Sequence, residues 1–149
     1  MPNERVRTSE LLQKLLKAVT LRQFIRQNGK NMDIPRFHDY ITNLSREKQM
    51  PPASVIKNSG IDRTFGYQIF SGKRTPSRDK VIQLAFGFRL DYEETQELLK
   101  IARRSELYPK IQRDAVFIYA LSNCLPLIDV QTALSELSLP LLGEVARDE

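Results

Sequence analysis

The stretch that decides the fold is MPPASVIKNSGIDRTFGYQIFSGKRTPS, residues 50–77. Val55 and Ile56 belong to a short apolar segment that follows two prolines, which suit the start of a helix. Gly60 comes directly after this segment, and glycine adopts a positive φ at low cost. The sequence therefore predicts a first short helix that ends in a glycine turn.

A second helix is predicted over residues 62–71. Asp62 is a typical N-cap residue, and Gly72 is a typical residue at a helix end. The apolar residues recur every fourth position and share one face: Ile61, Phe65 and Ile69. The remaining side chains point elsewhere: Arg63, Thr64, Tyr67 and Gln68. A helix–turn–helix with polar and basic side chains on the outer face of its second helix is typical of a reader of the DNA major groove.

This stretch resembles the Cro and phage-repressor type of helix-turn-helix, often called the XRE family. The resemblance extends from about Ile34 to Leu99. It is carried by the V-I-K-N-S-G-I run, by the G-K-R-T-P-S run and by the V-I-Q-L-A segment that follows. It implies an all-α fold with a five-helix core, to which this chain adds N-terminal helices and a C-terminal helix pair. It also implies double-stranded DNA as the partner and, because one unit reads few base pairs, a homodimer on a pseudo-palindrome.

The resemblance also assigns roles to individual residues. Arg63, Thr64 and Gln68 occupy the positions of the family's base-contacting side chains, and Tyr67 lies on the same outer face. We expect Arg63 to contact guanine and Gln68 to contact adenine. Phosphate contacts are predicted for six basic side chains, of which the third and fourth match the family's positions: Arg36, Lys57, Lys73, Arg74, Arg78 and Lys80.

Three departures from the family pattern favour a second interpretation. Pro51 and Pro52 stand where the family often has a polar phosphate contact, and Gly66 falls where it usually buries an aliphatic side chain. The second helix is also unusually aromatic. A protein-interaction adaptor, or an antitoxin-like partner of another, unidentified protein, is therefore the alternative function.

The charge distribution agrees with a DNA-binding segment. The chain of 149 residues carries a formal charge of +5. Residues 35–80 hold 9 basic and 4 acidic side chains, whereas residues 81–149 hold 7 basic and 11 acidic ones. Chance clustering on a solvated surface is the alternative. The coincidence of the basic segment with the helix–turn–helix motif favours a DNA-binding half joined to a half with another role.

Several classes of function are disfavoured by the composition. No apolar run approaches the roughly 20 residues of a membrane span. The single cysteine, Cys124, excludes an internal disulfide and a multi-cysteine metal site, and it is predicted to be a small buried hydrophobe. No phosphate-binding glycine loop and no Gly-x-Ser-x-Gly motif occur. We therefore expect a cytoplasmic protein that is not an enzyme, requires no cofactor or metal and does not bind a membrane.

The chain divides into three predicted segments. Residues 1–33 form an N-terminal helical extension, residues 34–104 the helix-turn-helix domain and residues 105–149 a C-terminal helical extension. Helices are predicted over residues 8–19, 21–28, 34–49, 78–87 and 92–103 besides the central pair. The leucine stripe of the first helix and the acidic C-terminal helices are both candidates for a dimer surface.

The C-terminal extension contains a possible internal repeat. The segment SRDKVIQLA at residues 77–85 aligns with QRDAVFIYA at residues 112–120, an offset of 35. With one residue inserted, Leu98 aligns with Leu134. The alignment predicts that the helix pair of residues 77–103 recurs and that the two pairs stack; chance similarity between amphipathic helices is the alternative.

Overall fold

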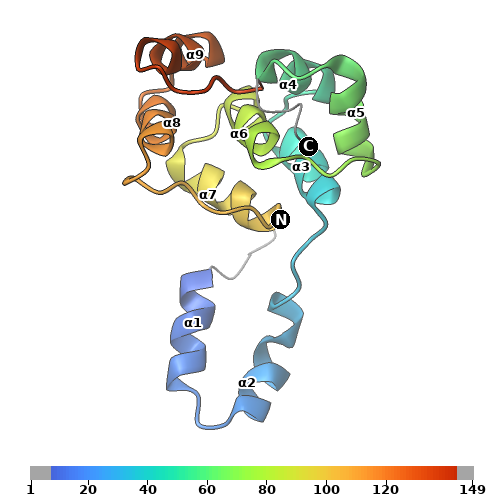
Figure 1. Cartoon of the computed structure of the whole chain (residues 1–149). Helices are drawn as coiled ribbons and strands as arrows, with labels where there is room; N and C mark the ends of the chain where they lie inside the picture. Colours follow the sequence, from blue (N-terminus) through green and yellow to red (C-terminus); the bar gives the residue numbers. More distant parts are fainter. Residues whose placement is uncertain (1–7, 144–149) are drawn as a thin grey trace. The chain divides into compact units, whose positions relative to one another are not determined.

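The computed structural model describes residues 8–143. Over this range the chain contains nine α-helices and one 3-10 turn and has no strand (Figure 1). The predicted all-α fold is therefore confirmed for the described part of the chain. These residues form two compact units, the first ending at Ile34 and the second beginning at Pro35.

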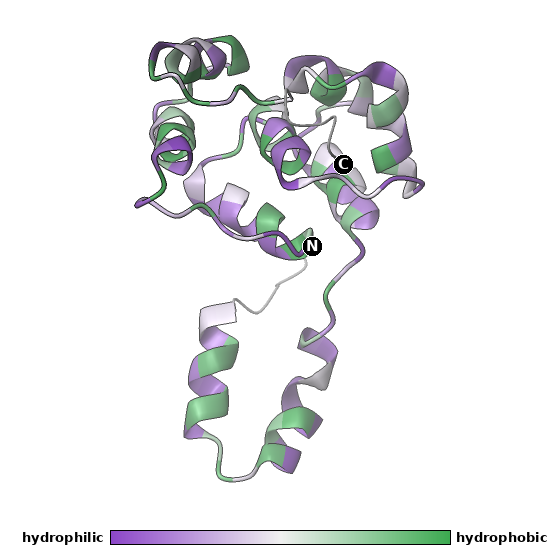
Figure 2. Ribbon diagram, viewed as in Figure 1, coloured by the Kyte–Doolittle hydropathy of each residue, from purple (hydrophilic) through white to green (hydrophobic). Residues whose placement is uncertain are grey.

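The first unit contains α1 (Thr8–Lys17), α2 (Leu21–Asn28) and the 3-10 turn Gly29–Asn31. The Thr20 side chain caps α2 by accepting a hydrogen bond from the backbone N–H of Gln23 at 3.2 Å. Apolar residues lie along both helices (Figure 2). Phe24 is buried, but six other large apolar side chains of the unit are exposed: Leu12, Leu15, Leu16, Val19, Leu21 and Ile25. The predicted leucine stripe thus remains on the surface.

The second unit is built from seven helices. They are α3 (Phe37–Glu47), α4 (Pro52–Ser59), α5 (Arg63–Ser71), α6 (Arg78–Gly87), α7 (Tyr92–Ile101), α8 (Gln112–Ser122) and α9 (Leu127–Glu136). The helix predicted over residues 34–49 starts later than expected, because Arg36 is extended and serves as the N-cap. A residue before proline disfavours the helical region, so Ile34 stays outside α3 and is 59% exposed.

The ends of α4 and α5 follow the sequence. Gly60 and Gly72 occupy the C-caps of α4 and α5 with φ angles of 66° and 84°. The carboxylate of Asp62 caps α5 by accepting a hydrogen bond from the N–H of Phe65 at 3.1 Å. These three end signals are confirmed.

Two further glycines allow helices to approach closely. A Cβ atom at Gly66 would lie 2.6 Å from the Ile56 side chain, so Ile56 of α4 fills the space of the aliphatic residue expected in α5. A Cβ atom at Gly87 would overlap Ser59 Oγ and lie 2.6 Å from the carbonyl oxygen of Val55. The prediction that Gly87 stops its helix is therefore wrong in its reason: the left-handed residue comes later, at Arg89, and Gly87 admits α4.

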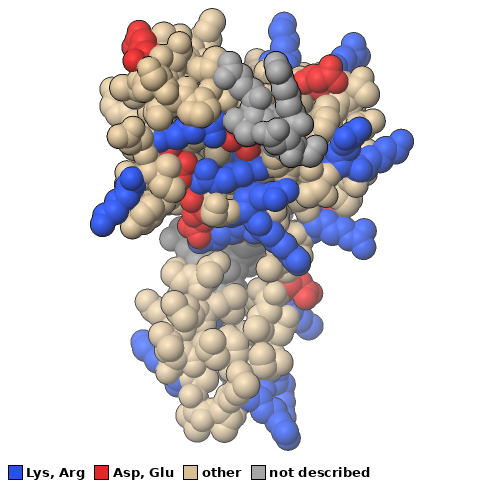
Figure 3. Space-filling model, in the orientation of Figure 1, with Lys and Arg blue, Asp and Glu red and all other residues tan. Residues whose placement is uncertain are grey.

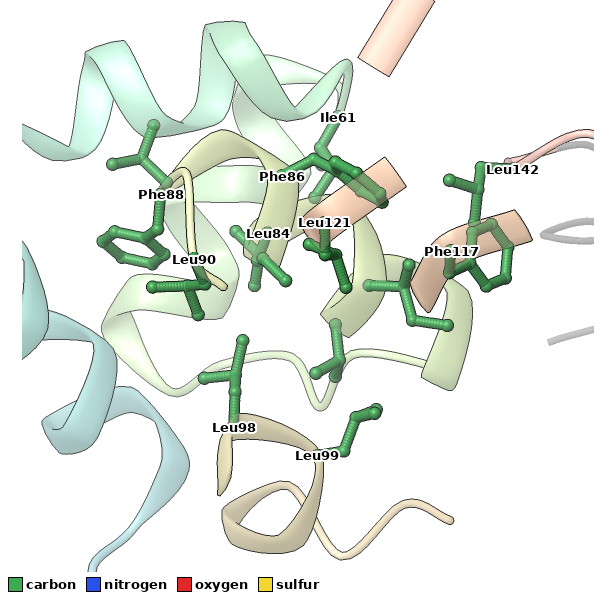
Figure 4. Close-up of a cluster of buried hydrophobic side chains, with 14 of the residues drawn as sticks. Ile61, Leu84, Phe86, Phe88, Leu90, Leu98, Leu99, Phe117, Leu121 and Leu142 are labelled. Atoms are coloured by element: carbon green, nitrogen blue, oxygen red, sulfur yellow. The ribbon is translucent and has the colours of Figure 1, made fainter. Parts of the chain in front are cut away.

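One hydrophobic core joins the helices of the second unit. α6 lies between α4 and α5 on one side and α8 and α9 on the other (Figure 1), and its apolar residues are all buried. The Phe86 and Phe117 rings meet edge to face at 6.5 Å between α6 and α8 (Figure 4). The helices on both sides of the boundary predicted at residues 104/105 contribute to this core.

The internal repeat appears as matched hydrogen bonds at a constant offset of 35. In the first repeat, the Gln96 side chain exchanges two hydrogen bonds with the backbone of Leu107, at 2.8 and 3.0 Å. In the second, Gln131 exchanges the same two bonds with Leu142, at 2.9 and 2.8 Å. The inserted residue in our alignment is therefore wrong: Leu134 corresponds to Leu99, and both side chains are fully buried.

The backbone repeats with the same offset. Arg89 and Cys124 end α6 and α8 with φ angles of 58° and 55°, and Arg103 and Ser138 follow α7 and α9 with 57° each. The left-handed position after α8 leaves Cys124 exposed. The prediction of a buried cysteine is wrong, because Leu125, one position later, turns inward toward the core instead.

Candidate nucleic-acid interface

The four residues predicted to contact bases lie together on the outer side of α5. Arg63, Thr64 and Tyr67 are exposed, and Gln68 is half-buried. They line one shallow hollow together with Ser71 and Lys73. The opposite side of α5 is buried through Gly66, Ile69 and Phe70. This division follows from the four-residue spacing of the buried side chains, which directs the polar ones outward.

The polar side chains of this face are held by one another. The Arg63 guanidinium lies 5.9 Å from the centre of the Tyr67 ring. The amide oxygen of Gln68 accepts a hydrogen bond from Arg74 Nε at 2.9 Å. A paired contact between Gln68 and adenine uses both the amide oxygen and the amide nitrogen, so Arg74 would have to release Gln68 for that contact to form.

Phe65 has a role that the sequence did not indicate. The spacing placed it on the buried face, but it is half-buried, and two cations lie over its ring. Arg74 is 5.1 Å and Lys80 Nζ is 4.8 Å from the ring centre. Cations at such distances are attracted by the ring quadrupole. The only sequence signal was the coincidence of an aromatic α5 with the basic segment that follows it.

A deeper cleft of about 860 Å³ adjoins the N-terminus of α5. Three predicted phosphate contacts, Lys73, Arg74 and Lys80, line it, together with Thr75 and Phe65. Asp62 also lines it, but its carboxylate caps the helix. Because Lys73 borders both this cleft and the shallow hollow, the two form one continuous basic surface around the first turns of α5.

Arg78 is not part of this surface, and its prediction as a phosphate contact is wrong. Its guanidinium donates two hydrogen bonds to Asp114, at 3.0 and 2.8 Å, and two more to the carbonyl oxygens of Ser105 and Glu106. These bonds use four of the five N–H groups of an arginine. The side chain fastens α6 to the second repeat.

The remaining two predicted phosphate contacts lie elsewhere in the second unit. Arg36 precedes α3 and Lys57 is on α4; both are exposed, and neither lines the hollow or the cleft. Lys and Arg side chains spread over the face seen in Figure 3, whereas few acidic side chains appear there. This surface attracts a polyanion.

Other kinds of site are not evident between residues 8 and 143. No three His, Cys, Asp or Glu side chains gather there as metal ligands would. None of the helices in that range has the length and apolar character needed to cross a bilayer. Comparison of the chain with protein-family models, with curated proteins and with solved structures gave no match.

Proposed function

We propose that the protein is a sequence-specific DNA-binding regulator that reads the major groove with α5. The observation that carries the proposal is the shared outward face of Arg63, Thr64, Tyr67 and Gln68, bordered by Lys73. An α-helix fits the major groove, and its outward polar side chains then reach the edges of the bases. Arg63 would pair with guanine, and Gln68 would contact adenine after leaving Arg74.

The cations beside the helix would bind the phosphates. Lys73, Arg74 and Lys80 line the cleft at the N-terminus of α5, where the positive end of the helix dipole also favours an anion. The Phe65 ring lies beneath two of them and so keeps their side chains near the groove. Such contacts position the protein and make its affinity depend on salt.

A homodimer is part of this proposal. One helix reads only a few base pairs, so two copies related by a two-fold axis would bind two half-sites about one helical turn apart. The bound sequence is then expected to be an inverted repeat.

The test is selection of bound sequences from a library of random duplexes, followed by titration of one selected duplex and a scrambled one at several salt concentrations. We expect enrichment of an inverted repeat and an affinity for both duplexes that falls steeply with salt. Absence of binding to any duplex at low salt, with the protein folded by circular dichroism, would overturn the proposal.

The alternative is a protein-interaction adaptor that uses the same surface. Tyr67 favours it, because this aromatic residue is 40% exposed in the centre of the hollow and stacks with Arg63, and tyrosine and arginine are both enriched at protein interfaces. The selection experiment separates the two functions: an adaptor would show no enriched sequence.

A further inference from the structure

The second repeat carries an open apolar groove between α8 and α9, with a volume of about 480 Å³. Its six lining residues are Gln112, Ala115, Val116, Tyr119, Ala133 and Leu137. Tyr119 and Leu137 are 66% and 61% exposed. Exposed apolar surface of this kind marks an interaction site in many proteins.

The repeat shows what such a groove accommodates. Thirty-five residues earlier, the same positions hold Ser77, Lys80, Val81, Leu84, Leu98 and Ala102. Val81, Leu84 and Leu98 are completely buried, in the core to which α3, α4 and α5 also contribute. The tight contact of Gly87 with α4 lies along the same stripe of α6. The face is therefore covered by amphipathic helices in the first repeat and open in the second.

The charges at the edge of the groove indicate the sign of its partner. On the covered face, Lys48 at the end of α3 forms an ion pair of 3.1 Å with Glu94 on α7. The position that corresponds to Glu94 on α9 is Asp129, which is exposed, and Glu136 is exposed on the same helix. The open groove thus offers a carboxylate where the covered one binds a lysine, so a basic amphipathic helix is its complement.

The first unit has this chemistry. Its two helices expose leucine side chains on α1, of which Leu16 is 75% exposed. Their basic residues are Lys14, Lys17, Arg22 and Arg26, and the acidic residue within them is Glu10. We propose that the helix pair α1–α2 of a second copy of this chain packs in the α8–α9 groove, and that each copy donates its pair to the other. This exchange does not depend on DNA binding.

The first test is the oligomeric state of the full chain without DNA, measured by sedimentation velocity under reducing conditions because Cys124 is exposed. We expect a dimer for the wild type. Tyr119→Asp in the groove and Leu16→Asp on α1 should each raise the dimer dissociation constant about tenfold or more, as substitutions of central interface residues do. Ile128→Asp is the matched control: Ile128 is 73% exposed on α9 but does not line the groove, so dimerisation should be unchanged.

A mixing experiment tests the exchange itself. The Tyr119→Asp copy retains a normal α1–α2 pair, and the Leu16→Asp copy retains a normal groove. Mixing the two should therefore restore one of the two contacts and produce a heterodimer that neither variant forms alone. The proposal is overturned if the wild type is monomeric, if either variant dimerises like the wild type, or if the mixture stays monomeric. These outcomes are read without DNA, so they are independent of whether α5 binds it.

Discussion

The guanidinium group of Arg78 on α6 holds the carboxylate of Asp114 on α8 with hydrogen bonds of 3.0 and 2.8 Å. Arg113 holds Asp79 in the reverse direction with two hydrogen bonds of 2.8 Å. Each arginine also donates to two backbone carbonyls of its own repeat, as at Pro140 and Leu141 for Arg113. The two crossed pairs therefore fix the angle between the repeats and tie each helix pair to the chain that follows it.

The crossed ion pairs should be a major source of stability for the second unit. Asp114 is 1% exposed, and its loss would leave the Arg78 charge with its main partner gone. We expect Asp114→Ala to lower the free energy of unfolding by about 3–5 kcal/mol, the usual effect of breaking a buried pair. Urea denaturation followed by circular dichroism measures this change. Glu136→Ala, at an exposed carboxylate of the same unit, should change stability by at most about 0.5 kcal/mol; equal effects of the two substitutions would contradict the role assigned to the pairs.

The contact of α4 with α6 should depend on the absence of a side chain at Gly87. In Gly87→Ala the new methyl group would meet the Val55 carbonyl, which is backbone and cannot rotate away. We expect a net loss of about 1–3 kcal/mol in unfolding free energy, although alanine favours a helix by about 1 kcal/mol over glycine. Thermal denaturation of this variant and of Gly29→Ala compares the two cases. A Cβ at Gly29 meets nothing within 4 Å, and Gly29 has a helical φ of −54°, so that variant should be no less stable than the wild type.

The sequence predicted the helices well because most of their signals are local. The caps Asp62, Gly60 and Gly72 act within one helical turn, and the spacing of Ile61 and Ile69 needs no knowledge of distant residues. The RD pairs at residues 78–79 and 113–114 were also visible as a repeat. Their crossed pairing was not, because it depends on how two helix pairs face each other.

The candidate site was predicted only in part, for the same reason. The outward face of α5 follows from helical spacing, and all four of its predicted residues share one hollow. The fate of a basic side chain depends instead on what lies opposite it. Arg78 meets a buried carboxylate supplied from 36 residues further along, whereas Arg74 lies over Phe65. Composition and family position could not distinguish these two arginines.

The base-reading role proposed for Arg63 gives a direct prediction. We expect Arg63→Ala to weaken binding to a selected duplex by about 1–3 kcal/mol and to relax the preference at one base position, since the bidentate contact to guanine is lost. Fluorescence titration against the selected duplex and its single-position variants measures both effects. Lys57→Ala is the control, because Lys57 is exposed on α4 and does not line the hollow; its substitution should not change the base preference. An Arg63 variant with full affinity and unchanged preference would contradict the assignment.

Phe65 should contribute to DNA affinity without touching a base. Its ring holds Arg74 and Lys80 at 5.1 and 4.8 Å, so their side chains are already ordered before DNA arrives, which saves about 0.5–1.5 kcal/mol for each immobilised side chain. We expect Phe65→Leu, which keeps an apolar side chain, to weaken binding to selected and scrambled duplexes by the same factor, about 1 kcal/mol or more. The dependence of affinity on salt should not change, because no charge is removed. Lys73→Ala should instead reduce the salt slope by about 0.9, and Phe65→Tyr, which retains the ring, should bind like the wild type. If Phe65→Leu binds as tightly as Phe65→Tyr, the ring does not position these cations for DNA, and their contribution is that of freely moving surface charges.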